Sequence, residues 1–386
     1  MPQSSETTAR SHPPEPFEVL IAGGGVAALE AAFALRELAG ELVNVRVLAP
    51  GGEFVYRPNA VKEPFTLGAA GRYQLDTLVA GAGAELVHGT LDRVDADRRV
   101  AHTAAGAELP YDALLLALGA SVHERYEHAT TVDDARIDEY LHGLVQDVEE
   151  GYVKRLAFVI PAPIAWPLPI YELALLTAQR AWEMQAELAV TILTPELTPL
   201  AVFGEGGSQE IQQLLSERGI EVITSAHCEI PQAKTIVVTP GGRRLEFDRI
   251  VALPQLRGPA LAGVPHDVGG FVPVDGFCRV SGVAAVFAAG DATDFPIKHG
   301  GLAAQQADVA ALSIAALAGA PVEPQPVDPM LEAVLLTGEE PRYFRAHLSG
   351  GHGPDSEVAG APTSSSRPKI AARYLADHLD GARSGR

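Results

Sequence analysis

The segment IAGGGVAALE, residues 21–30, constrains the fold of this chain more than any other part of its sequence. An apolar run with the character of a β-strand, Phe17–Ala22, leads into it, and a helix-like run, Leu29–Gly40, follows it. A second strand-like run, Leu42–Pro50, comes next. A strand, a helix and a second strand in this order form a βαβ unit, so the sequence predicts a parallel sheet.

The glycine pattern between the first strand and the helix predicts a dinucleotide-binding loop. Gly23, Gly25 and Ala28 have the spacing G-x-G-x-x-A. The first glycine permits a tight turn, the second lets a pyrophosphate approach the backbone, and the small third residue lets the helix pack against the strand. The N-terminus of the helix, beginning at Val26 and Ala27, would then point N–H groups at the phosphates.

The acidic residue that usually binds the ribose of such a dinucleotide is missing from its usual place. It is expected at the end of the second strand, about 20 residues after the glycines. Ala49 stands there, and the nearest acid, Glu53, comes four residues later. We therefore expect ribose recognition to be displaced or weak.

Two later segments extend this pattern to a known group of proteins. The apolar run Tyr111–Ser121 contains the turn Ala117–Leu118–Gly119, and the run Val283–Thr293 contains Gly290–Asp291. Together with the first loop, these motifs resemble the flavoproteins with two dinucleotide-binding domains, the pyridine nucleotide–disulfide oxidoreductase superfamily. The resemblance covers most of residues 17–316.

The resemblance implies that the cofactor is FAD. In that superfamily the first glycine motif and the late Gly-Asp motif both bind FAD, so Asp291 would bind the ribityl chain; a plain helix N-cap is the alternative. A helix starting near Gly301 and Leu302 would point its N-terminus at the flavin. Arg57 lies in a loop that approaches the flavin by resemblance, and a turn residue with a surface guanidinium is the alternative.

Lys298 and Glu172 are the predicted catalytic residues. Lys298 precedes a predicted helix N-terminus, whose dipole it opposes, and a nearby anion such as the reduced flavin would explain it. A solvated surface lysine is the alternative. The resemblance places Glu172 near flavin and nicotinamide, as a proton relay or a substrate contact. The alternative is an acid that stabilises the first turn of a helix.

A second βαβ unit, within residues 155–195, differs from the first at its loop. In the superfamily this unit carries another G-x-G-x-x-G motif, which binds NAD(P)H. Here Ala165, Pro167 and Ile170 fall at the glycine positions, and no glycine occurs between residues 152 and 203. Proline offers no N–H to a phosphate, so the sequence predicts that an ordinary NAD(P) site is absent.

Two branches of the superfamily resemble this chain most, the sulfide:quinone oxidoreductases and the type II NADH dehydrogenases. A proline-rich loop without glycine resembles the first branch, which uses a cysteine in or near this loop and another late in the chain. Here Trp166 stands in the loop, and the two cysteines are Cys228 and Cys278. We expect both cysteines to be buried small hydrophobes.

Charge and composition exclude several classes of partner. The chain has 29 basic and 49 acidic residues and a net charge of −20, which disfavours nucleic acid and anionic membrane surfaces. We predict neither a signal peptide nor a transmembrane segment. Two cysteines without CxxC spacing suit a reducing cytoplasm. No metal site is predicted, and the sequence leaves a homodimer open.

The predicted fold is α/β, with two Rossmann-like domains of which the FAD domain is interrupted by a degenerate NAD(P)-type domain. An amphipathic C-terminal run, Lys369–Leu379, predicts a helix packed against its own domain. The predicted division is a disordered tail (1–16), the two parts of the FAD domain (17–122 and 263–325), the degenerate domain (123–262) and a C-terminal segment (326–386).

The leading hypothesis is an FAD-dependent oxidoreductase that transfers electrons between a small donor and an acceptor, which a quinone-like molecule would suit. An NAD(P)H:quinone or NAD(P)H:acceptor oxidoreductase with atypical nicotinamide binding is the first alternative. A flavin-binding module without turnover is the second. In the leading hypothesis the flavin supplies the chemistry and the protein supplies orientation and electrostatics.

Overall fold

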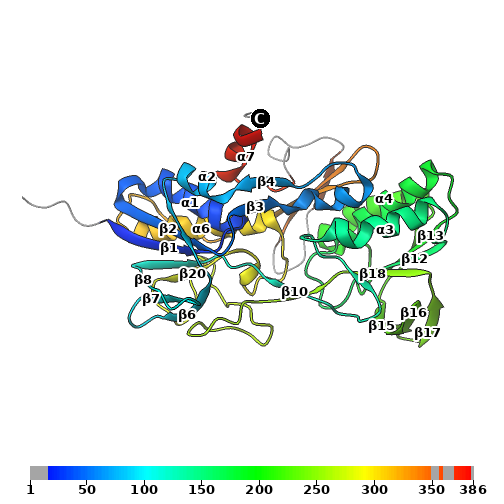
Figure 1. Cartoon of the computed structure of the whole chain (residues 1–386), viewed down its shortest axis with the longest axis horizontal. Coiled ribbons are helices and arrows are strands. Elements are labelled where there is room, and N and C mark those ends of the chain that lie inside the picture. Colours follow the sequence, from blue (N-terminus) through cyan, green and yellow to red (C-terminus); the bar gives the residue numbers. More distant parts are fainter. Residues whose placement is uncertain (1–15, 349–355, 360–368, 384–386) are drawn as a thin grey trace, which may run out of the picture.

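The computed structural model describes residues 16–348, 356–359 and 369–383. The tail predicted to be disordered, residues 1–16, lies outside these ranges except for Pro16. Figure 1 shows two lobes side by side, with the C-terminal helix α7 above the first. Among the described residues, no helix is both long enough and apolar enough to cross a bilayer.

The first lobe is built on a parallel sheet whose strands come from two distant parts of the chain. Its strand order is β20-β9-β1-β2-β5, and every neighbouring pair is parallel. The strands are β1 (Phe17–Ala22), β2 (Val43–Ala49), β5 (Glu85–His88), β9 (Ala113–Leu116) and β20 (Val286–Ala288). The βαβ prediction for the N-terminal residues is confirmed, since β1 and β2 are adjacent and parallel.

Helices cover one face of this sheet and a small antiparallel sheet covers the other. On the first face lie α1 (Val26–Ala39), α2 (Leu75–Gly81) and α6 (Gly300–Leu317). The facing sheet consists of β6 (Leu91–Asp95), β7 (Val100–Thr103) and β8 (Glu108–Pro110). Alternate residues of β1 point to opposite faces, so Ile21 belongs to one core cluster and Leu20 to the other.

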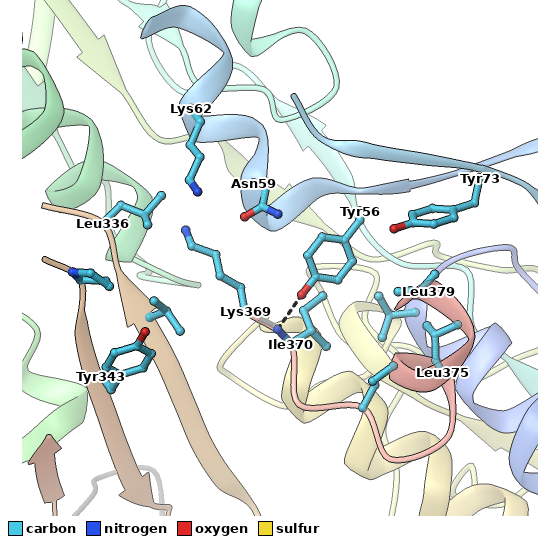
Figure 2. Close-up of a pocket in the computed structure, with 15 residues that line it drawn as sticks. Tyr56, Asn59, Lys62, Tyr73, Leu336, Tyr343, Lys369, Ile370, Leu375 and Leu379 are labelled. Atoms are coloured by element: carbon cyan, nitrogen blue, oxygen red, sulfur yellow. Dashed lines mark hydrogen bonds between the residues drawn. The ribbon is translucent and has the colours of Figure 1, made fainter. Parts of the chain in front are cut away.

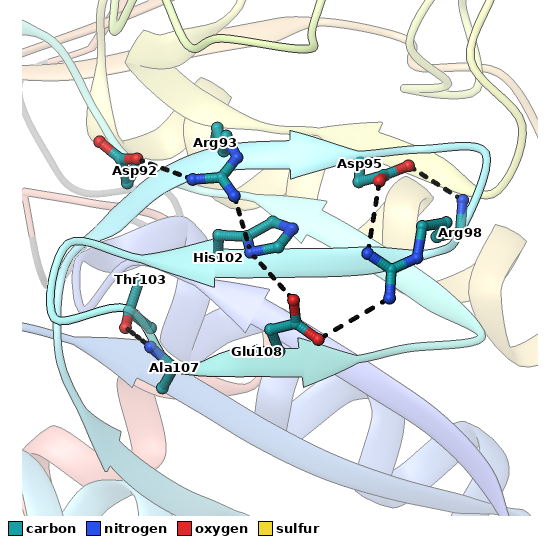
Figure 3. A network of polar contacts seen from close by, with 8 residues as sticks. All are labelled: Asp92, Arg93, Asp95, Arg98, His102, Thr103, Ala107 and Glu108. Atoms are coloured by element: carbon teal, nitrogen blue, oxygen red, sulfur yellow. Dashed lines mark hydrogen bonds and ion pairs between the residues drawn. The ribbon is translucent and has the colours of Figure 1, made fainter.

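The outer side of β6–β8 carries a network of polar contacts (Figure 3). The imidazole of His102 lies 3.2 Å from a guanidinium nitrogen of Arg93 and 3.7 Å from a carboxylate oxygen of Glu108. Arg98 lies within 3.9 Å of both Asp95 and Glu108. Because Arg98 and Glu108 are exposed, we attribute little stability to these ion pairs.

The second lobe repeats the layered arrangement. Its parallel sheet has the order β11-β18-β12-β13-β14, and its two faces bury separate core clusters. The strands are β11 (Thr130–Thr131), β12 (Arg155–Val159), β13 (Ala189–Leu193), β14 (Glu221–Ile223) and β18 (Arg249–Ala252). The helices α3 (Ile137–Glu149), α4 (Leu168–Glu183) and α5 (Gly204–Glu217) pack on one face, and the antiparallel strands β15 (His227–Gln232), β16 (Thr235–Thr239) and β17 (Arg243–Glu246) pack on the other.

Short elements connect the lobes and border the site described below. The antiparallel pair β10 (Ser121–His123) and β19 (Gln255–Arg257) forms where the chain passes from one lobe to the other and back. The pair β3 (Glu53–Tyr56) and β4 (Gly71–Gln74) is joined through the 3₁₀ segment η2 (Arg57–Phe65). Single 3₁₀ turns are η1 (Gly40–Leu42), η3 (Ala201–Phe203) and η4 (Gly290–Ala292).

The C-terminal segment contains one strand more than the sequence predicts. The strand-like runs at 331–337 and 342–349 predict two strands, which form β21 (Met330–Leu335) and β22 (Arg342–His347). These two strands pair with each other, and β23 (Ser356–Ala359) pairs with β22. The polar composition of residues 350–367 predicts a loop, and β23 corrects this prediction. Backbone pairing to an existing strand needs no apolar pattern, so the sequence carries no signal for it. The rest of that predicted loop lies outside the described residues.

The C-terminal helix begins later than its amphipathic pattern predicts. Helix α7 spans Leu375–Arg383, whereas the sequence predicts a helix from Lys369. The carboxylate of Glu30 on α1 accepts hydrogen bonds from the backbone N–H groups of Tyr374 (2.8 Å) and Leu375 (2.7 Å). A carboxylate that binds these otherwise unpaired groups defines a helix N-terminus. A residue distant in the sequence therefore sets the start of α7.

Helix α7 packs against its own lobe, as predicted. Ile370, Leu375 and Leu379 are buried in the core cluster that contains α1. The ring of His378 stacks on Phe33 at a centroid distance of 3.8 Å. Burial of these side chains fixes the segment that, as shown below, borders two cavities.

Truncation of Leu375 tests this docking. Leu375 is 1% exposed, and a Leu→Ala change in a core typically costs about 2–5 kcal/mol. We expect Leu375→Ala to lower the free energy of unfolding by about that amount in urea denaturation and to speed proteolysis of the C-terminal segment. The matched control is Leu317→Ala at the exposed end of α6, where Leu317 is 55% exposed and the change should stay within about 0.5 kcal/mol. Equal effects of the two changes would contradict the docking of α7.

Candidate functional site

A cavity of about 640 Å³ lies at the carboxyl ends of the strands of the first sheet. The first glycine loop, Ala49 after β2, Ala117 after β9 and Ala289 after β20 form one side of it. Trp166 and Glu172 of the second lobe contribute another side. Ligands of open parallel sheets bind in such crevices, outside the carboxyl ends of the strands.

The first loop has the shape that a pyrophosphate requires. Gly23 has φ = 134°, and a Cβ there would lie 2.0 Å from the carbonyl oxygen of Ala117, so no larger residue fits. Gly25 is the N-cap of α1 and has no side chain that could cap the helix. A Cβ at Gly25 would meet no atom within 4 Å. The N-terminus of α1 therefore faces open space, as the binding of phosphate demands.

Most of the residues predicted to bind the cofactor line this cavity. Those that line it are Gly23, Gly25, Val26, Ala27, Arg57, Ala117, Gly119, Gly290 and Asp291. Ala28, Gly301 and Leu302 do not line it. Ala28 and Leu302 are buried in the two core clusters, and the N–H of Gly301 donates to Nδ1 of His299 at 3.2 Å. Gly300, at the start of α6, lines the cavity instead.

Asp291 lies in the cavity wall close to two cations. Burial raises the pKa of its carboxyl group, while the charges of Lys298 and Arg57 lower it. The turn that carries Asp291 is held by Gln306 of α6, whose side-chain oxygen accepts from the N–H of Gly290 at 2.8 Å. Gly290 has φ = 76°, which favours glycine at this turn.

Lys298 is a buried lysine in the cavity wall, so the alternative of a solvated surface lysine is wrong. It is 9% exposed, its ammonium donates to the carbonyl of Thr293 at 2.5 Å, and it lies 4.0 Å from the ring centroid of Phe271. Burial lowers the pKa of Lys298 to about 8, although Asp291, Asp294 and Asp267 oppose this shift.

Glu172 lies in the cavity wall on the first turns of α4 and does more than stabilise a helix terminus. It is 2% exposed. Its Oε1 accepts from the ammonium of Lys369 at 2.6 Å and from the N–H of Leu336 at 2.9 Å. Burial raises the pKa of Glu172, and Lys369 is the largest influence that lowers it. A carboxylate so placed joins the second lobe to the C-terminal segment.

The sequence does not predict two ionisable residues of the cavity wall. Asp134 is half-buried there, and burial raises its pKa to about 6 although Arg57 lowers it. Lys369 reaches the wall only because the C-terminal segment folds back on the first lobe. Neither lies in a recognisable motif, and Lys369 is 197 residues away from its partner Glu172.

The second loop is fastened to the residues that precede α6. The carbonyl of Ala165 accepts from the N–H of Lys298 at 3.2 Å. The ring of Trp166 lies 4.8 Å from that of His299 and 6.1 Å from that of Phe203, measured between centroids. Pro167 is the N-cap of α4. Trp166, Leu168 and Pro169 therefore present a largely apolar wall to the cavity.

The two cysteines lie apart from the cavity lining. Both are buried and free, and neither contributes to the lining. Desolvation raises the pKa of each thiol to about 12, so neither forms a reactive thiolate near neutral pH. This confirms the prediction that Cys228 and Cys278 are buried small hydrophobes.

The chain is similar to known redox proteins in sequence and in fold. Residues 172–311 match the family model described as pyridine nucleotide-disulphide oxidoreductase. The sulfide:quinone oxidoreductase of Aquifex aeolicus superposes with a TM-score of 0.77 at 18% identity over 89% of this chain and 87% of that one. A ferredoxin reductase of Rhodopseudomonas palustris gives 0.65 at 19% identity over 86% and 83%. An NAD-dependent persulfide reductase of A. fulgidus gives 0.62 at 19% identity over 86% and 64%.

At these identities the superpositions establish the fold, that of the flavoprotein oxidoreductases. The match in sequence relates residues 172–311 to the pyridine nucleotide-disulphide oxidoreductases, and together with this fold it supports the prediction of an FAD-dependent oxidoreductase. The open glycine loop and the Gly290–Asp291 turn, which both line the cavity, fit FAD. When bound, FAD supplies the electron transfer, and the residues around it hold it, orient it and exclude water.

A bulky side chain at Gly25 tests the cofactor site. Gly25 has φ = −94° and open space beyond its Cα, so Gly25→Val should fold while its side chain occupies the place of the phosphates. We expect the ratio of flavin to protein to fall from about one to near zero, measured by absorbance, with the CD spectrum unchanged. The control is Gly143→Val on α3, where a Cβ also meets nothing within 4 Å. Full flavin retention in Gly25→Val would refute the assignment.

Replacement of Lys298 tests its influence on the flavin. A unit charge some ångströms away at an effective dielectric of about 20 is worth roughly 2 kcal/mol, or about 40 mV for a two-electron couple. Lys298→Met should therefore lower the flavin reduction potential by tens of millivolts at pH 6 to 7. Because the pKa of Lys298 is about 8, the difference should shrink as pH rises through 8. The control is Lys154→Met, whose side chain is 62% exposed. Equal potentials for wild type and Lys298→Met at pH 6 would contradict this role.

Proposed function

We propose that the protein transfers electrons through FAD between a small donor and a quinone-like acceptor, without a standard site for NAD(P)H. The observation that carries this proposal is the second loop. In the first lobe a glycine N-cap leaves the helix N-terminus open. In the second lobe Pro167 occupies the N-cap of α4, and Trp166, Leu168 and Pro169 beside it line the cavity.

The second loop lacks the groups that bind a pyrophosphate. Pro167 has no N–H to donate. Ile170, at the third glycine position, is fully buried in the core of the second lobe. The carbonyl of Ala165 is already bonded to the N–H of Lys298. This contact joins the loop to the residues before α6, and the loop offers a pyrophosphate no N–H at Pro167.

The wall formed by the second loop suits a smaller, more apolar molecule than a nicotinamide dinucleotide. Trp166 contributes a large ring, and Leu168 and Pro169 extend the apolar surface. Aromatic side chains commonly form the walls of small-molecule sites, where few polar groups set the orientation. We infer that this wall faces the flavin and that a quinone-like ring exchanges electrons there.

Glu172 and Lys298 are the groups proposed to handle protons and charge at this site. Both are buried and both line the cavity. Quinone reduction consumes protons, and burial raises the pKa of Glu172, which favours proton uptake by its carboxylate. Lys298 can balance negative charge on the bound cofactor.

The donor does not react through a cysteine of this chain. The fold resembles that of a sulfide:quinone oxidoreductase, but Cys228 and Cys278 lie outside the cavity wall, and both thiol pKa values are raised to about 12. We therefore propose direct exchange between donor and flavin. We also propose a cytoplasmic location, supported by two free buried cysteines. A homodimer stays a prediction.

Stopped-flow kinetics test the proposed function. Oxidised holoprotein is mixed anaerobically with NADH or NADPH, and photoreduced holoprotein with a short-chain ubiquinone analogue. We expect flavin reduction by either nicotinamide to be slow and unsaturated at micromolar concentration, and reoxidation by the quinone to be at least about tenfold faster, because only the smaller ring fits beside Trp166. Saturable, rapid reduction by micromolar NADH or NADPH would contradict the proposal.

Two variants of Trp166 sharpen this experiment. Trp166→Ala removes the apolar wall and should slow reoxidation by the quinone. Trp166→Phe keeps an aromatic ring and should retain most of the rate. If both variants react with the quinone like the wild type, the acceptor does not bind against this loop.

A further inference from the structure

A second cavity, of about 480 Å³, lies between the first lobe, the β21–β22 hairpin and α7 (Figure 2). It shares four wall residues with the flavin cavity, namely Val26, Val334, Lys369 and Ile370. Its other described wall residues come from β3, η2, β4, the hairpin and the C-terminal segment. The family match and the proposed electron transfer leave this cavity without a role.

One end of the second cavity is positively charged. The ammonium groups of Lys62 and Lys369 point toward each other, and the amide of Asn59 lies beside them (Figure 2). Lys369 is paired with Glu172, whereas the ammonium of Lys62 forms no hydrogen bond or ion pair with any described residue. The described lining contains these two lysines and no carboxylate. Two lysines and one paired carboxylate leave an excess of one positive charge.

The other end of the second cavity is apolar. Tyr343 stands opposite Lys369 on β22, and the side chains of α7 close the far side (Figure 2). The apolar wall consists of Val26, Val334, Leu336, Ile370, Leu375 and Leu379. The backbone N–H of Ile370 beside this wall already has a hydrogen-bond partner, because it donates to the hydroxyl of Tyr56 at 2.8 Å. A ligand that removes this apolar wall from water is stabilised by the hydrophobic effect.

We propose that this second cavity binds a small amphipathic anion with a single carboxylate headgroup. The headgroup would lie between Lys62 and Lys369, where it supplies the missing negative charge and accepts charge-assisted hydrogen bonds. The apolar body would lie along α7 and β21. Alkyl and aromatic carboxylates share this chemistry, and the experiment below distinguishes them.

A ligand in the second cavity would change the pairing of charged residues that line the flavin cavity. Lys369 lines both cavities and holds Glu172 at 2.6 Å. A carboxylate between the two lysines would compete with Glu172 for the ammonium of Lys369. Glu172 would then lose its cationic partner and bind a proton more readily. The position of Lys369 therefore links occupancy of the second cavity to the flavin environment.

Calorimetric titration of the FAD-loaded protein tests the proposal. The ligands are octanoate and 2-naphthoate, and the controls are the uncharged analogues 1-octanol and 2-naphthalenemethanol. We expect at least one carboxylate to bind with a stoichiometry of one, and its uncharged analogue to bind roughly ten- to a hundredfold more weakly, as the loss of a hydrogen bond to a charged group implies. Tighter binding of octanoate would assign an alkyl ligand, and tighter binding of 2-naphthoate an aromatic one.

Substitution of Lys62 supplies the matched comparison. Lys62→Met should weaken the carboxylate about tenfold or more and leave the uncharged analogue unchanged, while Lys154→Met on the far lobe should change neither. If Lys62→Met fails to fold, the comparison of charged and uncharged ligands on wild-type protein still decides. No binding of either carboxylate, equal binding of acid and alcohol, or an unaffected Lys62→Met would each overturn the proposal.

Discussion

The close approach of the first loop to the neighbouring strand is the constraint on which the rest of the structure depends. The N–H of Gly23 donates to the carbonyl of Leu48 at 2.8 Å, and the missing Cβ of Gly23 leaves room for the carbonyl of Ala117. These contacts bring the ends of β1, β2 and β9 to one place. As a result the N-terminus of α1 faces a cavity. Strand β20, which pairs with β9, brings the Gly290–Asp291 turn to the same cavity.

The two lobes repeat one architecture and use it differently. In both, a βαβ unit directs a helix N-terminus toward the region between the lobes. A glycine is the N-cap of the first of these helices, whereas Pro167 is the N-cap of the second, beside Trp166 and the contact between Ala165 and Lys298. The same fold accommodates a glycine loop or a proline-containing loop. What each lobe can bind therefore depends on the residues of its loop.

Buried charges join the C-terminal segment to the rest of the molecule. Glu30 binds the start of α7 through two backbone N–H groups, and Glu172 binds Lys369. A buried charge is costly without a partner, so each of these carboxylates favours the docked position of the segment. The same segment borders both cavities, so Lys369 is shared by the flavin site and the proposed anion site.

The sequence by itself determined the parallel sheets, the first glycine loop and the turn at Gly290–Asp291, because each depends on a strict local requirement: hydrophobic period, a positive φ or the absence of a Cβ. The sequence also shows that the second loop contains no glycine. Only the tertiary structure decided that Lys298 is buried, that Ala28, Gly301 and Leu302 lie outside the cavity lining, that α7 begins at Leu375 and that Lys369 meets Glu172. These outcomes depend on contacts between residues far apart in the chain, such as Glu30 with Leu375 and Lys369 with Glu172. Local pattern holds no information about such partners, since burial and pairing are properties of the folded surroundings of a residue and not of its neighbours in sequence.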